Sequence, residues 1–291
     1  MPALHTCSLA LASLLLAPIA ACTDDPTVSS TADDTEAQWQ EFQAHPPMTW
    51  EAFRATAQRG PDAPGAGVRY IVDGDLQLPE ESLRAHYDAW LRQEFDASAG
   101  GSALSVLTSL GADVIWPAAQ RNNLTYCISN GFGSRKAAVV TAMDQATRSW
   151  SDRIGVTFRY VPAQDATCTN ANTNVVFNVR LVSASFFGSA FFPNDARASR
   201  ELQLTSAAFT TQAGGRDLQG ILRHETGHIL GFRHEHIHIT CTGEGPGDSR
   251  LLTAYDVNSV MHYPQCRPSG TGGYRQTALD FAGAASLYGA R

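Results

Sequence analysis

The sequence predicts an α+β fold in which helices pack against a mixed sheet. From about residue 112 onward, stretches rich in β-branched residues and of alternating polarity, typical of strands, are interleaved with two segments of helical periodicity. The chain has 291 residues, 43% of them hydrophobic, which is enough for one or two ordinary cores. The order strand, helix, strands, helix favours a mixed α/β layer over an all-helical or all-strand domain.

The expected elements of this C-terminal part follow one another with recognisable boundaries. In order they are strand 124–129, helix 134–155, strands 156–161 and 172–182, a hairpin or edge strand formed by 188–193 and 200–205, and a helix at about 216–230. Ser134 suits the start of the first helix and Gly155 its end. Gly231 can adopt the left-handed conformation that ends a helix, so we expect the second helix to stop there.

The first 47 residues differ in composition from the rest. Residues 1–21 carry the apolar run LHTCSLALASLLLAPIAA, which is short for a membrane span and ends in small residues, as secretory signals do. The end of this run together with Cys22, IAAC, resembles a bacterial lipobox, in which Cys22 would be lipidated. The usual positive segment ahead of it is missing, since no Lys or Arg precedes Arg54. Residues 22–47 are acidic and rich in Ser and Thr, which predicts a disordered linker. We therefore expect an exported protein, either secreted or lipid-anchored at the outer membrane or cell surface.

Residues 48–111 form a separate block ahead of the C-terminal domain, 112–291. The block contains a predicted strand at 67–78 and a predicted helix at 79–95, where Pro79 suits the first helical turn. Its end, DASAGGSALS, is rich in Gly, Ser and Ala and predicts a loose connection.

The charge of the chain argues against a nucleic-acid partner. The net charge is −7, and no dense basic run could neutralise a phosphate backbone. We expect a monomer that contacts a membrane only through the lipid at its N-terminus.

The cysteines indicate disulfides rather than a metal site. Once the signal is removed and Cys22 is lipidated, four remain: Cys127, Cys168, Cys241 and Cys266. In an oxidising compartment an even number predicts two disulfides, and four cysteines allow three pairings. Sequence order favours Cys127–Cys168 and Cys241–Cys266, because each pair closes a local loop. None has the close spacing of a zinc ribbon.

The stretch HETGHILGFRHEH, residues 224–236, holds four of the nine histidines. On a helix, residues four apart share one face, so His224 and His228 present their imidazoles side by side. A sharp turn at Gly231 lets His234 return as a third ligand. Three neutral imidazoles suit one zinc ion and leave a position open for water, which is typical of a catalytic site.

Glu225 lies at a neighbouring edge of the same site. Zinc lowers the pKa of a bound water to about 7, and Glu225 is placed to take its proton as general base. That combination attacks an amide carbonyl, and Glu225 can return the proton to the leaving nitrogen. The further histidines His236, His238 and His262 are expected around the site rather than on the metal. Nothing in the sequence indicates calcium, and whether calcium supports the fold stays open.

These residues resemble the metzincin zinc metallopeptidases. HETGHILGFRH matches their H-E-x-x-H-x-x-G-x-x-H pattern, and SVMHYP, residues 259–264, resembles their Met-turn, with Met261 beneath the zinc. Tyr263 matches the tyrosine that in astacin-type and serralysin-type members is a further zinc ligand and can swing away to stabilise the oxyanion. The resemblance covers residues 124–288 and implies a twisted mixed sheet, an active-site helix, one catalytic zinc and peptide substrates.

The chain departs from the astacins in two respects. The segment between His234 and Met261 is short, and the compact C-terminal part looks closer to bacterial HEIGH-type and matrixin-like secreted peptidases, so the subfamily stays open. In astacins the glutamate at the position of Glu235 is tied to the mature N-terminus, which the sequence does not locate here.

The segment YIVDGDLQL, residues 70–78, resembles the F-x-G-D segment of astacin propeptides. The aspartate of that segment takes the water position on zinc and keeps the precursor inactive. The resemblance implies this role for Asp75, ahead of Asp73, and makes 48–111 a propeptide-like region. Asp-Gly-Asp is also ordinary turn chemistry.

Two functions are consistent with the sequence. The first is a secreted or lipid-anchored zinc metalloendopeptidase that hydrolyses peptide bonds in proteins, its extended substrates pairing with an edge strand. The second is a surface-displayed binding lipoprotein whose zinc site is structural or inactive. Glu225 favours the first, because an inactive descendant often loses the base and this chain keeps it.

Overall fold

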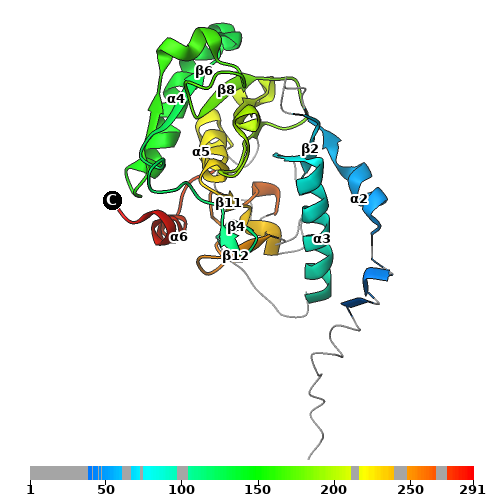
Figure 1. Ribbon diagram of the computed structural model, residues 1–291. Coiled ribbons are helices and arrows are strands. Elements are labelled where there is room, and N and C mark those ends of the chain that lie inside the picture. The colour runs from blue at the N-terminus through cyan, green and yellow to red at the C-terminus, as the bar shows by residue number, and fades with distance from the viewer. Residues whose placement is uncertain are drawn as a thin grey trace, which may run out of the picture.

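The computed structural model, shown in Figure 1, describes most of the chain beyond its N-terminal segment. The described residues are 39–40, 42–44, 46, 48–60, 67–72, 75–96, 104–210, 216–238, 248–266 and 274–291. The predicted signal and most of the predicted linker lie outside them, together with Cys22, Asp73 and Cys241. Within the described ranges, no helix combines the length and the apolarity that crossing a bilayer requires.

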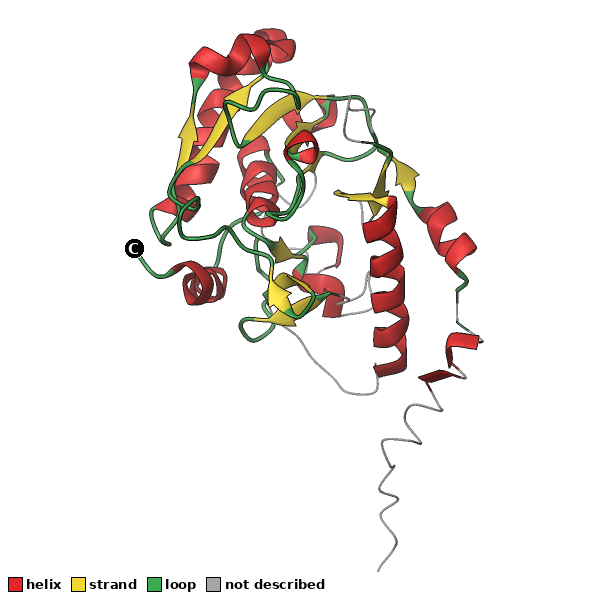
Figure 2. Cartoon of the chain, viewed as in Figure 1, coloured by secondary structure: helices red, strands yellow, loops and turns green. Residues whose placement is uncertain are grey.

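A five-stranded sheet forms the upper part of the molecule (Figure 2). Its strands are β6 (Leu124–Ile128), β7 (Phe158–Tyr160), β8 (Phe177–Leu181), β9 (Gly188–Ser189) and β10 (Glu201–Leu204), in the order β7-β6-β8-β10-β9. β9 runs antiparallel to β10 at one edge, and the other neighbours are parallel. The mixed sheet confirms the predicted α+β class and provides an edge strand within the predicted segment 188–193.

Two long helices share the main hydrophobic core with this sheet. α4 (Lys136–Ser151) follows β6, and α5 (Leu218–Ile229) follows β10. The helices pack on each other, and Trp150 Nε1 of α4 donates a hydrogen bond of 3.1 Å to the carbonyl oxygen of Arg223 in α5. This packing fixes the position of α5, which carries two of the predicted metal ligands.

The ends of α4 differ from the prediction. Ser134 does not cap the helix, because it lies inside the 3₁₀ turn η1 (Asn130–Arg135), and the N-cap residue Arg135 makes no side-chain cap hydrogen bond. The helix also ends at Ser151, before Gly155. The 3₁₀ turn η1 leads directly into α4, so the start of the helix does not depend on the expected serine cap.

A smaller sheet lies below the first. It consists of β4 (Ser105–Ser109), β5 (Ala112–Asp113), β11 (Phe232–Arg233) and β12 (Ser249–Leu251), and the C-terminal helix α6 (Ala278–Tyr288) completes this part. β4 pairs antiparallel with both β11 and β12. Leu104 and Val106 are buried. The chain from Leu104 onward is therefore built into the C-terminal part, several residues before the predicted boundary at 112.

The N-terminal region lies along one side of this body (Figure 1). It contains α2 (Trp50–Thr56), a three-stranded antiparallel sheet of β1 (Gln58–Arg59), β2 (Arg69–Val72) and β3 (Leu76–Pro79), and the long helix α3 (Glu80–Asp96). The predicted strand at 67–78 is thus a hairpin of β2 and β3. Leu76 forms a parallel bridge with Ala190, the residue after β9, and packs in one apolar cluster with Val114 and Phe192. The hairpin is therefore attached to the edge of the main sheet.

One predicted disulfide is present. Cys127 and Cys168 are bonded, with Cα atoms 5.6 Å apart, and connect β6 to the residue after the 3₁₀ turn η2 (Pro162–Thr167). Cys266 is also disulfide-bonded. Its predicted partner Cys241 lies outside the described residues, so that pairing stays a prediction.

Candidate metal centre

The helix α5 supplies the first two histidines of the site. Its N-cap Asp217 accepts a hydrogen bond of 2.6 Å from the Gly220 amide, and this satisfies a donor that the helix start would otherwise leave free. His224 and His228 lie one turn apart on the buried face of the helix and are both almost inaccessible to solvent. The i, i+4 spacing therefore presents both imidazoles to one point, as predicted.

Gly231 turns the chain so that the third histidine returns to the same point. Its φ is +97°, and a Cβ at this position would lie 2.1 Å from the carbonyl oxygen of Val114. Only glycine meets both conditions without strain. After the turn, Phe232 and Arg233 form β11, and His234 follows them fully buried.

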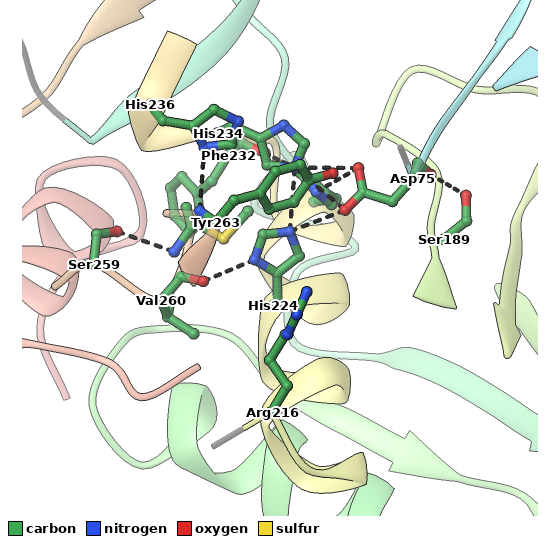
Figure 3. A network of polar contacts seen from close by, with 12 residues as sticks. Asp75, Ser189, Arg216, His224, Phe232, His234, His236, Ser259, Val260 and Tyr263 are labelled. Atoms are coloured by element: carbon green, nitrogen blue, oxygen red, sulfur yellow. Dashed lines mark hydrogen bonds and ion pairs between the residues drawn. The ribbon is translucent and has the colours of Figure 1, made fainter. Parts of the chain in front are cut away.

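Asp75, which comes from the N-terminal hairpin, meets the three histidines, and Figure 3 shows it facing His224 and His234. Its carboxylate oxygens lie 3.2 Å from His224 Nε2, 3.1 Å from His234 Nε2 and 3.8 Å from His228 Nε2. One ligand atom from each of the four residues lies within 4.8 Å of the others, and all four residues are buried. The structure thus brings Asp75 together with the three predicted ligands.

Hydrogen bonds on the far sides of the rings orient two of the imidazoles. His224 Nδ1 lies 2.7 Å from the Val260 carbonyl oxygen, and His228 Nδ1 lies 2.8 Å from that of Phe232. Because a carbonyl only accepts, each Nδ1 carries the proton and donates it. The unprotonated Nε2 lone pairs then point into the cluster, which is the arrangement that a metal-binding histidine requires.

The donor set fits a zinc ion. His228 Nε2, Asp75 Oδ1 and Glu225 Oε2 are buried side-chain atoms without a hydrogen-bond partner, and all three belong to this site. Converging imidazole nitrogens and a carboxylate in a buried site are costly unless a cation compensates them. Neutral imidazoles with one carboxylate are ligands that zinc accepts.

Burial sets the protonation of the neighbouring groups. Desolvation lowers the pKa of His228 to about 4, so this imidazole is neutral at pH 7. For Asp75, burial acts to raise the pKa, but the charge of His234 and the hydrogen bonds of the histidines outweigh it and hold the pKa well below its usual range. For Glu225, burial and then the charge of Asp75 raise the pKa well above the ordinary value. The pKa values of the two carboxyl groups are thus shifted in opposite directions, that of Asp75 downward and that of Glu225 upward.

Met261, the predicted Met-turn residue, lies against α5. A Cβ on Gly227 would lie only 2.4 Å from Met261 Sδ, so the methionine packs directly against the helix between the two histidines. The turn that carries it is anchored by Asp280 of α6, which accepts hydrogen bonds from Ser259 Oγ at 2.6 Å and from the Val260 amide at 2.9 Å. Because Val260 in turn accepts from His224, Asp280 supports a ligand indirectly.

Tyr263 lies beside the cluster, with its ring centroid 4.4 Å from that of His234. Its amide donates a 3.2 Å hydrogen bond to His236 Nδ1, and the two rings stack. His262 Nε2 lies 2.8 Å from the hydroxyl of Tyr255. Within the described residues, His236 and His262 lie outside the four-residue cluster, and the side chain of His238 is not described.

Glu235 holds the segment after the third histidine to the Met-turn. Its amide donates to the Met261 carbonyl oxygen at 2.9 Å, and its Oε1 accepts from the Asp256 amide at 2.7 Å. Burial raises the pKa of Glu235 to about 8. Its contacts in the described residues are thus with the Met-turn side of the site.

Several residues at the site carry no local signal in the sequence. Tyr274 lies with its ring centroid 4.4 Å from that of His224, Gly188 of β9 faces Glu225, and Arg216 points toward the histidine cluster from the start of α5 (Figure 3). Each reaches the site through tertiary packing, so no motif predicts it. Asp280 is partly predictable from the sequence. Thr277 and Asp280 form a capping box, and the spacing of these two residues could have revealed it.

The family model described as matrixin matches residues 116–241, the part of the chain that contains the main sheet, α5 and all three histidines. This match supports a zinc metallopeptidase of the metzincin type, in agreement with the resemblance.

Comparison with solved structures finds a hatching enzyme among the similar chains. It is high choriolytic enzyme 1, a zinc-protease from Oryzias latipes (medaka fish), with a TM-score of 0.43 and 20% sequence identity. The match covers 64% of this chain and 100% of that chain. Comparison with curated proteins gives no match.

Proposed function

We propose that the chain is a zinc metalloendopeptidase made as a latent precursor, with Asp75 blocking the metal site. The observation that carries the proposal is the convergence of three buried histidine Nε2 atoms on the Asp75 carboxylate, beside the buried carboxyl group of Glu225. A structural zinc site has no use for a buried glutamate that is not a ligand.

The residues of the site suit peptide hydrolysis. His224, His228 and His234 would hold one zinc ion, which supplies Lewis-acid polarisation of the carbonyl and of water. Glu225 would take a proton from the attacking water and deliver it to the leaving nitrogen. A carboxyl group that does so must hold a proton near neutral pH, and burial raises the pKa of Glu225 in that direction. Tyr263 borders the same cavity as Glu225, where its hydroxyl can donate to the developing oxyanion.

The edge strand β9 would bind the substrate backbone. In the precursor the N-terminal hairpin occupies this edge. Leu76 bridges to Ala190, and Ser189 Oγ donates to the carbonyl oxygen of Asp75. A peptide can take the same edge only after the hairpin has left it. We propose protein or peptide substrates that bind in extended form.

Activation would separate the N-terminal region from the catalytic domain. Because Leu104 and β4 belong to the C-terminal part, we place the cut between Asp96 and Leu104, so that 48–96 acts as the propeptide. Ahead of it we propose the signal 1–21, lipidation at Cys22 and export to the cell surface, outer membrane or medium. Mass spectrometry of the unprocessed chain's N-terminus checks signal removal and lipidation at Cys22, and that of the processed chain checks the cut, since a terminus far inside the catalytic domain contradicts it.

The enzymatic proposal is tested with Glu225→Gln. The processed chain loaded with zinc should cleave casein or quenched peptides, should lose this activity with a chelator, and should lose roughly a hundredfold or more with Glu225→Gln, since the base is gone. Zinc content should stay equal in both proteins. If the loaded wild-type chain cleaves nothing, the site is inactive and the binding-lipoprotein alternative stands.

The latency proposal is tested with Asp75→Ala in the full chain. Removing the blocking carboxylate should raise the basal activity of the unprocessed protein. Asp88→Ala is the matched control, because Asp88 also lies in the N-terminal region but is exposed, and its ion pair among the described residues is with Arg84 in α3. Equal latency of Asp75→Ala and the control contradicts the role of Asp75.

A further inference from the structure

A small cavity opens beside Glu225. Its volume is about 190 Å³, below that of cavities for drug-sized ligands, so it suits a single side chain. The walls are largely aromatic and aliphatic, formed by Phe186, Phe187, Ile221 and Tyr274, with Arg216 and Gln265 as polar members. Since Glu225 and Tyr263 also line it, the cavity adjoins the position of the reacting peptide bond.

Arg216 is held in this cavity without an acidic partner. Its guanidinium lies over the ring of Phe187, 5.1 Å from the centroid, and Nη1 donates to Gln265 Oε1 at 3.3 Å. Its Nε is buried without a hydrogen-bond partner. The nearby Arg275, in contrast, pairs with Asp217 at 2.8 Å. Among the described residues, the ion pairs include none made by Arg216. A cation that packs on an aromatic ring with an open donor is suited to binding a carboxylate.

Activation makes the cavity more favourable for an anion. In the precursor two carboxyl groups line it, those of Asp75 and Glu225. When the hairpin leaves, Asp75 goes with it and one negative charge is lost from the walls. Arg216 then faces the incoming substrate, and Glu225 is the acidic residue that remains among the described residues of the lining.

The direction of the edge strand assigns the cavity to one side of the scissile bond. From Asp75 the hairpin runs parallel to the edge at Ala190, toward a separate cleft lined by Leu78, Phe192 and Asp195. A substrate paired antiparallel, the more stable arrangement, runs the opposite way. Its residues before the scissile bond lie in that cleft, and the residue after the bond enters the cavity with Arg216.

We propose that Arg216 is a specificity-determining residue that selects an acidic side chain directly after the scissile bond. The inference rests on the proposed endopeptidase function. A hydrogen-bonded charge pair of this kind is expected to favour Asp or Glu over the matching amide by roughly 10- to 100-fold in kcat/KM.

The test uses the processed chain loaded with zinc, in which the hairpin no longer occupies the edge at Ala190. Quenched peptides, amidated at the C-terminus, differ only in the residue after the scissile bond, which is Asp, Glu, Asn, Gln, Leu or Lys, and mass spectrometry locates each cut. The Asp to Asn and Glu to Gln ratios should fall to about one in Arg216→Gln. Arg216→Glu should favour Lys, a gain that a damaged fold does not produce. Arg135→Gln is the control, since Arg135 also lies over a phenylalanine ring but away from this cavity.

Each outcome decides the inference. An acidic preference that depends on Arg216 supports it. Cleavage without acidic preference, or a preference kept in Arg216→Gln, overturns it while leaving the endopeptidase function intact. A second peptide set ends at this residue with a free C-terminal carboxylate; if cleavage depends on Arg216 in that set and not in the amidated set, the cavity binds chain ends and the side-chain assignment is overturned. If no peptide is cut even after processing, the proposed function fails and the inference fails with it.

Discussion

Gly188 offers a way to displace the proposed catalytic base without touching it. A Cβ at this position would lie 2.6 Å from Glu225 Oε1 and 2.8 Å from Ile221 Cγ2. Ordinary van der Waals contact begins at 3.4 Å, so Gly188→Ala requires Glu225 to move by 3.4 − 2.6, or about 0.8 Å. The backbone of Gly188 is not in the left-handed region, so alanine adds no conformational strain.

The expected effect follows from this displacement. A misplacement of about 1 Å at a reacting centre costs roughly 100-fold in rate. We therefore expect kcat/KM of the activated Gly188→Ala chain to fall by about two orders of magnitude. Overpacking against Ile221 should lower the free energy of unfolding by about 1–3 kcal/mol. Zinc content should be unchanged, because the three atoms nearest to the new methyl group belong to Glu225 and Ile221 and not to a histidine.

The assay combines peptide cleavage, zinc analysis and urea unfolding on one preparation. Gly131→Ala is the control, since its Cβ would meet only Ser129 Oγ, at 3.3 Å, and Gly131 also has an ordinary φ. If Gly188→Ala keeps wild-type kcat/KM within about twofold, the position of Glu225 does not control the reaction, and the reasoning from its geometry is refuted.

Three further predictions concern stability. Gly231→Ala combines a φ of +97° with a Cβ 2.1 Å from the Val114 carbonyl oxygen. The variant should therefore lose at least about 3 kcal/mol of unfolding free energy and bind zinc poorly in a titration. A stable variant that binds zinc contradicts this. Replacing Cys127 and Cys168 by alanine opens a loop with a sequence separation of 41 and should cost about 4 kcal/mol in urea unfolding, whereas an unchanged midpoint argues against it. Burial raises the pKa of Asp280 from 3.8 to about 6, so the folded state binds the proton more tightly and stability from this group falls as pH rises from about 4 to 6. The unfolding free energy of wild type relative to Asp280→Asn should therefore drop by up to about 3 kcal/mol over that range, and a constant difference excludes the effect.

The metal ligands could be predicted because their arrangement is local. His224 and His228 are brought together by one helical turn, and His234 by a single glycine, so eleven consecutive positions define the site. The elements around them also follow from periodicity, including α5 and the strands of the main sheet. Tertiary packing added contacts from other segments but left the three histidines in the local arrangement that the sequence predicts.

Contacts between distant segments could not be predicted in the same way. Asp75 is 149 positions from His224, and only the resemblance to a propeptide segment suggested that they meet. Arg216 and Gly188 reach the site because β9 and the start of α5 enclose one cavity, and nothing in their neighbouring sequence encodes it. The domain boundary shifted for the same reason, since β4 gains its place only by pairing with β11 and β12.

In the proposed precursor, Asp75 would affect both the access to the site and its chemistry. The histidines hold the pKa of Asp75 well below its usual range, whereas burial and then the charge of Asp75 raise the pKa of Glu225. On the proposed function, Asp75 would therefore occupy the water position and also favour the protonated form of the base. When Asp75 leaves, its charge no longer raises the pKa of Glu225, although burial still does. The comparison of Asp75→Ala with wild type therefore reports on both effects, because on the proposed function the same carboxylate would block the metal and disfavour the ionisation of the base.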